Sequence, residues 1–172
     1  MAEKREFSLW LRPLGDIAFK LKQRIEALSK KFDTPAFDPH ITLLGGLPES
    51  EATLTQLTDT LAGSLEPFEV ELTKAGYRDT FYQSLFIHVG KNEQLLRARK
   101  TAEQLFNYGS DEQYMPHVSL LYGDLTREEK ERILNSIGRE FHIRFGVHNL
   151  MLVDTTGKPA DWKYVHSSEF RS

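Results

Sequence analysis

One short pattern of residues occurs twice in this chain, at positions 39–46 and 116–123. The first copy reads Pro-His-Ile-Thr-Leu-Leu-Gly-Gly, and the second, nearly half a chain later, reads Pro-His-Val-Ser-Leu-Leu-Tyr-Gly. In both copies, one aliphatic residue separates a histidine from a hydroxyl residue. A repeat that keeps its polar groups at matched positions predicts two similar lobes. Each lobe should contribute one histidine and one hydroxyl group to a shared cleft.

The composition of each copy predicts a strand with one polar face. Alternate side chains of a strand point to opposite faces, so His40 and Thr42 should share a face, as should His117 and Ser119. The aliphatic residues between them should face a core. A single histidine on a strand is usually a hydrogen-bonded structural residue. The same polar pair occurring twice in apolar strands, where an unpaired polar group costs ~1–3 kcal/mol, favours a functional site.

Hydrophobic periodicity divides the rest of the chain into helices and strands. Apolar spacings of three and four predict helices that start at Asp16 as N-cap, at Pro48–Ser50, at Asn92 and at a Thr126/Glu129 capping box. Alternation predicts strands at 7–11, 40–43, 69–74, 82–89, 117–120, 141–145, 149–153 and 162–165. We therefore expect an α+β protein in which two similar lobes of antiparallel sheet, with outer helices, are related by a pseudo-twofold axis. Residues 1–172 should form a single bilobal domain whose two sheets face a central cleft.

The repeat extends beyond the two histidine segments. Ser8-Leu9-Trp10, before the first helix, resembles Ser84-Leu85-Phe86, before the third. Each half of the chain therefore reads as strand, helix, histidine strand and helix, which supports the two-lobe prediction.

Composition limits the classes of function. The chain has 172 residues and a formal net charge of -3, so it lacks the basic field with which proteins bind long nucleic acids. It contains no cysteine, which excludes disulfides, thiolate zinc sites and a cysteine nucleophile. No apolar run approaches the ~20 residues of a membrane helix, and the N-terminus does not lead into a signal-peptide core. We expect a cytoplasmic protein with no membrane partner.

His-x-Thr-Leu at 40–43 and His-x-Ser-Leu at 117–120 resemble the paired signature of the two-histidine (2H) phosphoesterase superfamily. Within it, the chain is most similar to the cyclic phosphodiesterases that open ADP-ribose 1″,2″-cyclic phosphate and nucleoside 2′,3′-cyclic phosphates. Further matching stretches sample most of the chain: 8–10 with Pro13, 35–43, 82–83 and 114–122. The resemblance implies a metal-independent hydrolase that uses no cofactor. We expect it to act as a monomer on a small cyclic-phosphate nucleotide or ADP-ribose substrate, with RNA ends as a further candidate substrate.

This chemistry requires the residue types that the repeat supplies. Opening a cyclic phosphodiester needs a base that takes a proton from water and an acid that protonates the departing ribose oxygen. Histidine, with a reference pKa of about 6.5, can serve as either. Thr42 and Ser119 are then placed to donate hydrogen bonds to the phosphate oxygens. The resemblance makes His117 the base and His40 the acid, but the near-symmetric sequence by itself leaves this assignment open.

Three aromatic residues are candidate substrate-binding residues. Tyr82 and Tyr122 match family positions near the ligand, and Trp10 shares a strand face with Ser8. Each could stack on a base or close over the ribose, and the alternative for each is core packing. Tyr122 occupies the place of Gly45 in the first copy, so the two lobes should differ in nucleoside binding. The remaining histidines show no comparable pattern and are interpreted as surface or hydrogen-bonding residues: His88, His142, His148 and His166.

Three other functions remain as alternatives. A histidine metal site is disfavoured because neither motif histidine has a second histidine or a carboxylate at ligand spacing. A 2′-5′ RNA ligase or oligonucleotide phosphodiesterase of the same superfamily is disfavoured by the acidic net charge. A non-catalytic nucleotide-binding module has no need for two histidines in matched positions.

Overall fold

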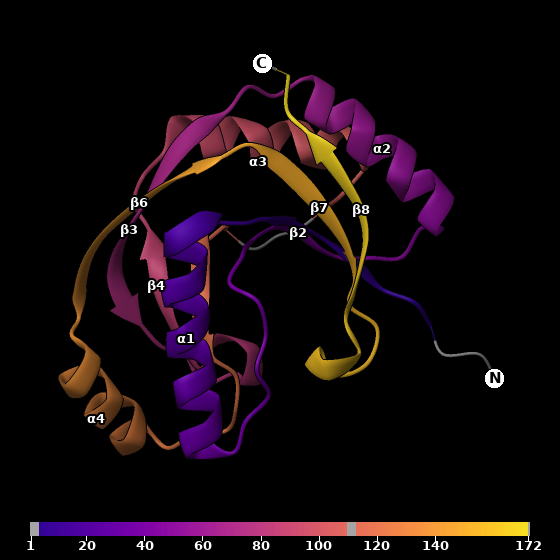
Figure 1. The fold of residues 1–172 in the computed structure, drawn as a ribbon. Helices are drawn as coiled ribbons and strands as arrows, with labels where there is room; N and C mark the ends of the chain where they lie inside the picture. The colour runs from indigo at the N-terminus through magenta and orange to yellow at the C-terminus, as the bar shows by residue number, and fades with distance from the viewer. Residues whose placement is uncertain (1–3, 110–112, 172) are drawn as a thin grey trace.

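The fold is built on one antiparallel sheet (Figure 1). The computed structural model describes residues 4–109 and 113–171. Within these residues eight strands are arranged in the order β6-β3-β4-β5-β2-β1-β7-β8. Their bounds are β1 Phe7–Leu11, β2 Ile41–Leu47, β3 Phe68–Gly76, β4 Leu85–Val89, β5 His117–Leu121, β6 Glu140–Val147, β7 Asn149–Asp154 and β8 Lys163–Glu169.

The helices fall between the strands, as the sequence predicts, so the α+β class is confirmed. In the described part of the chain the α-helices are α1 Gly15–Phe32, α2 Glu51–Gly63, α3 Glu93–Leu105 and α4 Arg127–Ile137. Two short 3-10 helices, η1 Phe81–Gln83 and η2 Pro159–Asp161, precede β4 and β8. Among these described helices, none has both the length and the apolar character that a membrane crossing requires.

Two four-stranded halves meet at the centre of the sheet. The two strands of the repeat, β2 and β5, are antiparallel neighbours, with Ile41 opposite Val118. Outward from this pair the order is β1-β7-β8 on one side and β4-β3-β6 on the other. We call the half β2-β1-β7-β8 the His40 lobe and the half β5-β4-β3-β6 the His117 lobe. The lobes share one continuous sheet where two sheets were expected, because β2 and β5 bond to each other.

The first copy of the repeat contains a β-bulge. Leu9 of β1 pairs with Leu44 of β2, but the next residue, Trp10, pairs with Thr42. Leu43 is therefore an extra residue in β2. A bulge of this kind changes the direction in which side chains point, so both leucines of the copy enter the core, each with an exposed fraction of 0%.

The second copy contains the same bulge. Leu85 of β4 pairs with Leu121 of β5, whereas the next residue, Phe86, pairs with Ser119. Leu120 is the extra residue here and is fully buried. The two consecutive leucines of each copy thus have one structural cause, and the polar face of each strand stays on the other side.

Helix starts follow the sequence signals at three of the four α-helices of the described residues. The side chains of Ser50 and Asn92 each accept a hydrogen bond from the backbone N–H three residues later, at the starts of α2 and α3. Thr126 and Glu129 form the expected capping box of α4. The prediction of Asp16 as the cap of α1 is wrong, since the N-cap position is Leu14 and Asp16 lies in the first turn. There its carboxylate still favours the positive end of the helix dipole.

The strand expected from Tyr82 starts later, at Leu85. Residues Phe81–Gln83 form η1 instead, and the backbone N–H of Arg78 donates to the carbonyl of Gln83 at 2.9 Å. This turn removes Tyr82 from the strand. The chain therefore presents Tyr82 from η1, just before the start of β4.

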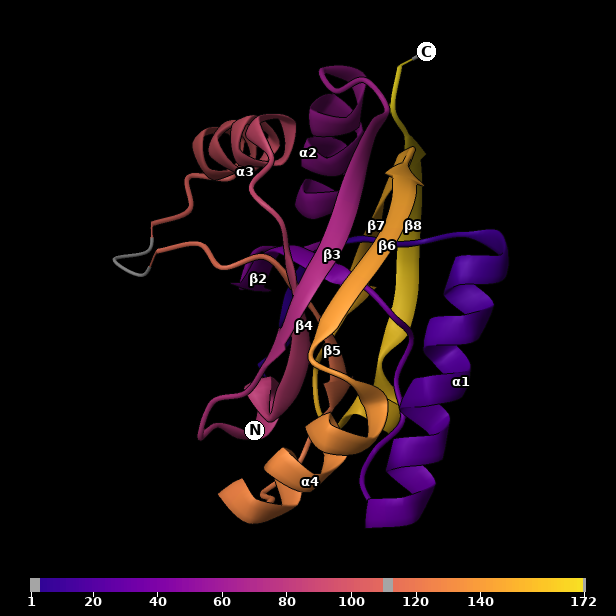
Figure 2. The same cartoon turned by 90° about the vertical axis from the view of Figure 1, so that its left-hand side faces the viewer.

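Helices from one lobe pack on strands of the other. α1, which follows β1 in the chain, contacts β5, and α3, which follows β4, contacts β2, so each helix contacts a central strand of the other lobe. α2 lies beside α3 and covers β7 and β8. Figures 1 and 2 show α2 and α3 toward one end of the sheet and α1 and α4 toward the other. These contacts tie the two lobes together around the central strands.

Candidate active site

The two motif histidines stand at the start of the central strands. His40 directly precedes β2, and His117 is the first residue of β5. Because Ile41 lies opposite Val118, continuing this antiparallel register places each histidine opposite the hydroxyl residue of the other lobe. Ile41 and Val118 are fully buried, so their polar neighbours point to the other face. One cleft of about 650 Å³ is lined by all four polar side chains: His40, Thr42, His117 and Ser119.

Both imidazole rings are held through the same nitrogen. Nδ1 of His40 lies 2.8 Å from the carbonyl oxygen of Asp38, and Nδ1 of His117 lies 2.8 Å from that of Met115. A carbonyl oxygen only accepts, so Nδ1 carries the hydrogen in both rings. Neither Nε2 has a hydrogen-bond partner among the residues that the structure describes. Each neutral ring can therefore accept a proton at Nε2, and each protonated ring can donate one from it.

Different aromatic rings lie against the two histidines. Trp10 stacks face to face on His40, with 3.5 Å between ring centroids and 7° between planes. Phe86 lies beside His117 with 4.9 Å between centroids and a tilt of 52°. Trp10 lines the cleft but has an exposed fraction of only 3%, and one of its faces is covered by the imidazole. Its contact with a substrate stays a prediction.

Burial lowers the pKa of both histidines. At His40 burial outweighs the opposing hydrogen bond to the Asp38 carbonyl, and the pKa falls to about 4. At His117 burial is again the largest cause, and the positive charges of Arg78 and of protonated His88 add to the lowering of the pKa. In the protein alone both rings are therefore neutral near pH 7. An anionic phosphate beside the rings acts in the opposite direction, because it favours the imidazolium form.

The two hydroxyl residues can both serve as donors. Oγ of Ser119 donates to the carbonyl of Tyr82 at 3.4 Å, a long bond that a phosphate oxygen can replace. Thr42 is held through its backbone, because its carbonyl accepts a hydrogen bond from the Tyr114 hydroxyl at 2.8 Å. In the described part of the chain, the Thr42 hydroxyl has no protein partner.

Aromatic side chains from both lobes form part of the cleft wall. Ring centroids of Tyr82 and Tyr122 lie 5.1 Å apart, and those of Tyr82 and Trp162 lie 6.2 Å apart. Tyr122 has an exposed fraction of 4% and stacks on Phe37, whereas Tyr82 has an exposed fraction of 47%. Tyr82 thus offers an open ring to a ligand, and Tyr122 packs mainly behind it.

Arg99 is a cleft residue that the sequence reasoning missed. It lies on the buried side of α3, where Nη1 donates to the carbonyl of Leu43 at 2.6 Å and Nε donates to Glu103 at 2.6 Å. Its guanidinium lies 4.5 Å from the ring centroid of Tyr114. An arginine four residues after Leu95, on the apolar stripe of a helix, was the available signal, because a buried cation needs partners.

Arg78 and Trp162 were also missed. Arg78 lines the cleft from the loop after β3, and its Nη1 donates to the side-chain oxygen of Gln83 at 3.4 Å. Lys130 of α4, with an exposed fraction of 2%, fixes this loop by donating to the carbonyl of Arg78 at 2.8 Å. Trp162 follows η2 and was interpreted only as the start of a strand. No local pattern marks either residue, because tertiary contacts bring them to the cleft.

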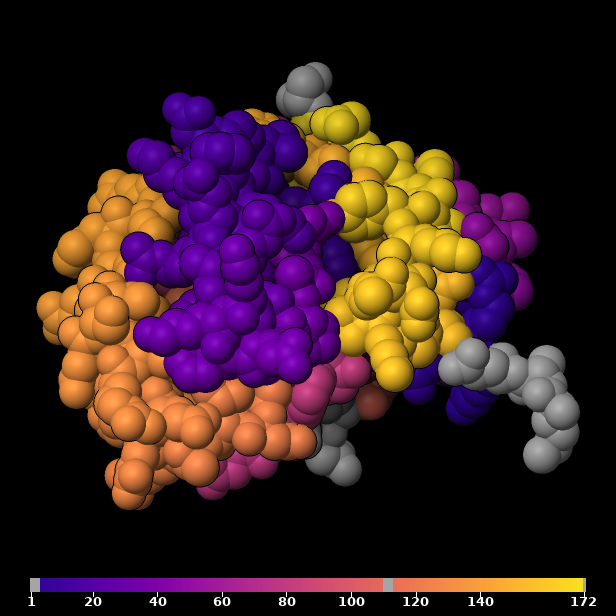
Figure 3. Space-filling view, turned by 60° about the horizontal axis from the view of Figure 1, so that its bottom comes forward, coloured from indigo at the N-terminus to yellow at the C-terminus, as the bar shows by residue number. Residues whose placement is uncertain are grey.

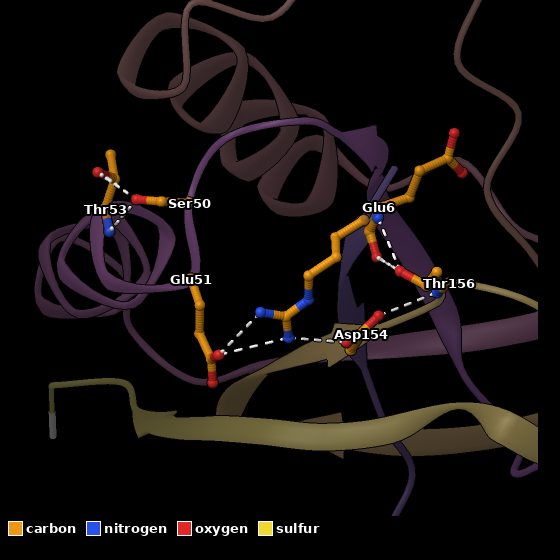
Figure 4. A network of polar contacts seen from close by, with 7 residues as sticks. Glu6, Ser50, Glu51, Thr53, Asp154 and Thr156 are labelled. Atoms are coloured by element: carbon orange, nitrogen blue, oxygen red, sulfur yellow. Dashed lines mark hydrogen bonds and ion pairs between the residues drawn. The ribbon is translucent and has the colours of Figure 1, made fainter. Parts of the chain in front are cut away.

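Polar contacts fix the edge of the cleft in the His40 lobe (Figure 4). The backbone N–H of Glu6 donates to the hydroxyl of Thr156 at 2.9 Å. Arg5 forms ion pairs with Glu51 at 3.4 Å and with Asp154 at 2.8 Å. Glu6 and Thr156 both line the cleft. The network therefore joins the start of β1 to the loop after β7.

The charges that line the cleft are mainly positive. Lys4, Arg78 and Arg99 contribute cations, and Glu6 contributes one carboxylate. Across residues 4–109 and 113–171, no three His, Cys, Asp or Glu side chains gather as a set of metal ligands. The cleft thus suits an anionic ligand.

Comparison with known proteins identifies relatives of this chain. The family model for cyclic phosphodiesterase-like proteins matches residues 6–170. A curated relative, the cyclic phosphodiesterase of Arabidopsis thaliana, is 26% identical over 129 residues, which cover 75% of this chain and 71% of the relative.

Solved structures share the fold. TT0787 of Thermus thermophilus has a TM-score of 0.68 at 20% identity, covering 97% of this chain and 98% of its own. LigT of E. coli, complexed with 3′-AMP, has a TM-score of 0.65 at 15% identity, covering 99% of this chain and 100% of its own. These likenesses confirm the predicted fold class.

Proposed function

The chain belongs to the cyclic phosphodiesterase-like family of 2H phosphoesterases, and from this premise we propose that it opens small cyclic phosphodiesters without a metal. The proposed substrates are nucleoside 2′,3′-cyclic phosphates, which give 2′-phosphates, and ADP-ribose 1″,2″-cyclic phosphate, which gives ADP-ribose 1″-phosphate. The observation that carries the proposal is the matched placement of His40 and His117. Each ring is bonded at Nδ1 to a backbone carbonyl, lines one cleft and lies near a hydroxyl group.

In the proposed reaction, a water molecule attacks phosphorus in line with the departing ribose oxygen. One neutral imidazole takes a proton from the water at Nε2 while the other, protonated, gives its Nε2 proton to the departing oxygen. The bond from phosphorus to the water oxygen forms as the bond to the 3′ oxygen breaks, so the phosphate stays on the 2′ oxygen. Thr42 and Ser119 donate hydrogen bonds to the non-bridging oxygens, where negative charge develops.

We assign His117 as the base and His40 as the acid, as the family resemblance implies. Two contacts support this assignment at His40. The negative charge of Asp38 acts to raise the pKa of His40, against the positive charges of His117 and Arg12, and the face of Trp10 favours an imidazolium through a cation–π interaction. At His117 the nearby positive charge of Arg78 disfavours a second cation. Burial opposes protonation of both rings. The negative charge of the bound phosphate favours protonation and so counteracts the effect of burial.

The size and lining of the cleft support a small nucleotide as substrate. A volume of about 650 Å³ is in the range of pockets for small ligands. Structures of E. coli LigT hold 3′-AMP, ATP and NADP+. By analogy we propose that Tyr82 and Trp162 contact the base or ribose and that Arg78 contacts phosphate. One copy of the chain supplies both histidines, so we propose that a monomer is active.

A substrate panel tests this proposal. The purified protein is incubated with 2′,3′-cyclic nucleotides, ADP-ribose 1″,2″-cyclic phosphate, a cyclic-phosphate RNA end and a 2′-5′-linked dinucleotide, with and without EDTA. Phosphorus NMR then identifies which oxygen keeps the phosphate. We expect 2′-phosphates and ADP-ribose 1″-phosphate, at rates that EDTA does not change. Three outcomes would contradict the proposal. Cleavage of the 2′-5′ linkage alone would favour the 2′-5′ RNA ligase or oligonucleotide phosphodiesterase, and binding without turnover would favour the nucleotide-binding module. Loss of turnover in EDTA would favour a metal site.

A further inference from the structure

Asp38 connects His40 to a polar cluster outside the main cleft. Its backbone carbonyl accepts the hydrogen on Nδ1 of His40 at 2.8 Å. Its carboxylate accepts hydrogen bonds from the hydroxyl of Tyr164 on β8 and, at 2.9 Å, from Nζ of Lys22 on α1. The residue that fixes the His40 ring is thus itself fixed from two other elements of the fold.

Tyr164 contacts both groups that hold the His40 ring. Besides its hydrogen bond to Asp38, its ring meets Trp10 edge to face, with 6.1 Å between centroids and 84° between planes. The guanidinium of Arg12 lies 4.5 Å from the centroid of the Tyr164 ring on the same side of the fold. Two contacts on Tyr164 therefore restrict its ring, and a third directs its hydroxyl to Asp38.

The cluster lies outside the substrate cleft but adjoins it, because Trp10 and Trp162 line both cavities. Tyr164, Lys22 and Asp38 line a separate cavity of about 190 Å³. It lies where the segment after α1 meets the chain from η2 to β8, and Figure 3 shows this seam between violet and yellow atoms. Among the described residues that line the main cleft, neither Asp38 nor Tyr164 is present. Their influence on a reaction in the cleft therefore acts through His40 or through Trp10, which stacks on His40 and lines both cavities.

Charges in the cluster favour the arrangement. Burial acts to raise the pKa of Asp38, but the hydrogen bonds from Tyr164 and Lys22 outweigh it, so the net pKa is lowered and the carboxylate stays ionised. Burial and the bond to Asp38 raise the pKa of Tyr164 to about 12, so its hydroxyl keeps its proton and donates. The charges that face His40 come from Asp38, from Arg12 and from His117 across the cleft.

Among the described residues, His117 has no equivalent of this anchor. Met115 stands two residues before His117, as Asp38 stands two residues before His40, and its side chain carries no charge. In both copies a proline follows, and the residue before a proline is restricted to extended conformations, which helps to aim its carbonyl. In the first copy, the hydrogen bonds of the Asp38 carboxylate to Tyr164 and Lys22 add to the restriction that the proline imposes. The Met115 side chain cannot form such bonds.

We propose that Asp38, anchored by Tyr164 and Lys22, is a positioning residue that keeps His40 in one tautomer and one orientation. An anchored carbonyl holds the Nδ1 hydrogen while Nε2 gains and loses a proton, so the ring stays aimed at the cleft through the cycle. Its effect on turnover rests on the proposed function. The position of the ring itself can be measured without any substrate.

Tyr164→Phe is the most selective test, because it removes one hydroxyl and keeps the ring against Trp10 and Arg12. The matched control is Tyr77→Phe, which removes a hydroxyl bonded to Glu131 at 2.5 Å. Tyr77 is not among the described residues that line the main cleft. We expect Tyr164→Phe to lower kcat ~10-fold with KM within about twofold of wild type. The control should leave both constants within about twofold.

A second readout separates positioning from general stability. In nitrogen-15 NMR spectra, wild-type His40 should show a single tautomer with the hydrogen on Nδ1, and Tyr164→Phe should mix the tautomers of His40 and leave His117 unchanged. Asp38→Asn, which keeps the backbone carbonyl, should give the same result and serves if Tyr164→Phe does not fold. Unchanged His40 signals in a folded variant, or equal losses in both tyrosine variants, overturn the proposal. If wild type opens no cyclic phosphate, the proposed function fails, and the spectra still decide the positioning.

Discussion

The His40 lobe and the His117 lobe share a backbone plan and differ in what surrounds the histidine. Both contain a β-bulge after the hydroxyl residue, and both bond Nδ1 to the carbonyl two residues earlier. His40, however, is stacked on Trp10 and tied to the charged residue Asp38. His117 lies beside Phe86, near a positive charge from Arg78. The repeat thus sets where the imidazoles stand, and residues outside the repeat make them chemically unequal.

Removing either histidine should have the largest effect. We expect His40→Ala and His117→Ala each to lower kcat by ~10²–10⁴, and the double variant to lose little more, because the two groups act in one step. Steady-state kinetics on a 2′,3′-cyclic nucleotide measure this. His142→Ala, which removes an exposed histidine of β6, is the control and should leave kcat unchanged. Wild-type turnover in either motif variant would remove that residue from the mechanism.

Removing either hydroxyl should have the next largest effect. Thr42→Ala and Ser119→Ala should each lower kcat by ~10², because each takes away one donor to the developing charge, and KM should rise as phosphate binding weakens. The exchanges Thr42→Ser and Ser119→Thr keep the hydroxyl and should retain most of the activity. If the exchanges and the alanine variants lose activity equally, packing and not hydrogen bonding explains the loss.

Exchanging the backing rings tests the inequality of the lobes. Trp10→Phe gives His40 the neighbour that His117 has, and Phe86→Trp does the reverse. A cation–π contact is worth ~1 kcal/mol at this kind of site, so Trp10→Phe should lower the pKa of His40 by somewhat less than about one unit and kcat by ~5-fold. Phe86→Trp should change kcat less, since the base acts from its neutral form. Proton NMR titration of each ring gives the pKa values, and equal effects of the two exchanges would contradict the assignment.

The parts of the site that the sequence predicted are those with local causes. Alternation placed His40 with Thr42 and His117 with Ser119, because strand geometry alone decides which side chains share a face. The parts it missed depend on contacts between distant segments. Tyr164 bonds to Asp38 across 126 positions, and no periodic pattern reports such a pairing.

The error at Tyr82 has the same origin. Its segment alternates like a strand, but Lys130 of α4 fixes the carbonyl of Arg78 and the chain turns at η1. The double leucine of each copy, by contrast, was visible in the sequence. Its cause, a bulge, appeared only when the register of β1 with β2 and of β4 with β5 was known.

The pH dependence of kcat/KM in wild type and in the two histidine variants tests the acid–base pair most directly. Activity is proportional to the fraction of enzyme with one histidine protonated and the other neutral, and this fraction is largest midway between the two apparent pKa values. Burial lowers the pKa values of both histidines below 6.5 in the free protein. We predict a bell with its maximum below pH 6.5 in wild type. His40→Ala should lose the limb that falls as pH rises, and His117→Ala the limb that falls as pH drops. A flat wild-type profile, or loss of the same limb in both variants, would contradict the account.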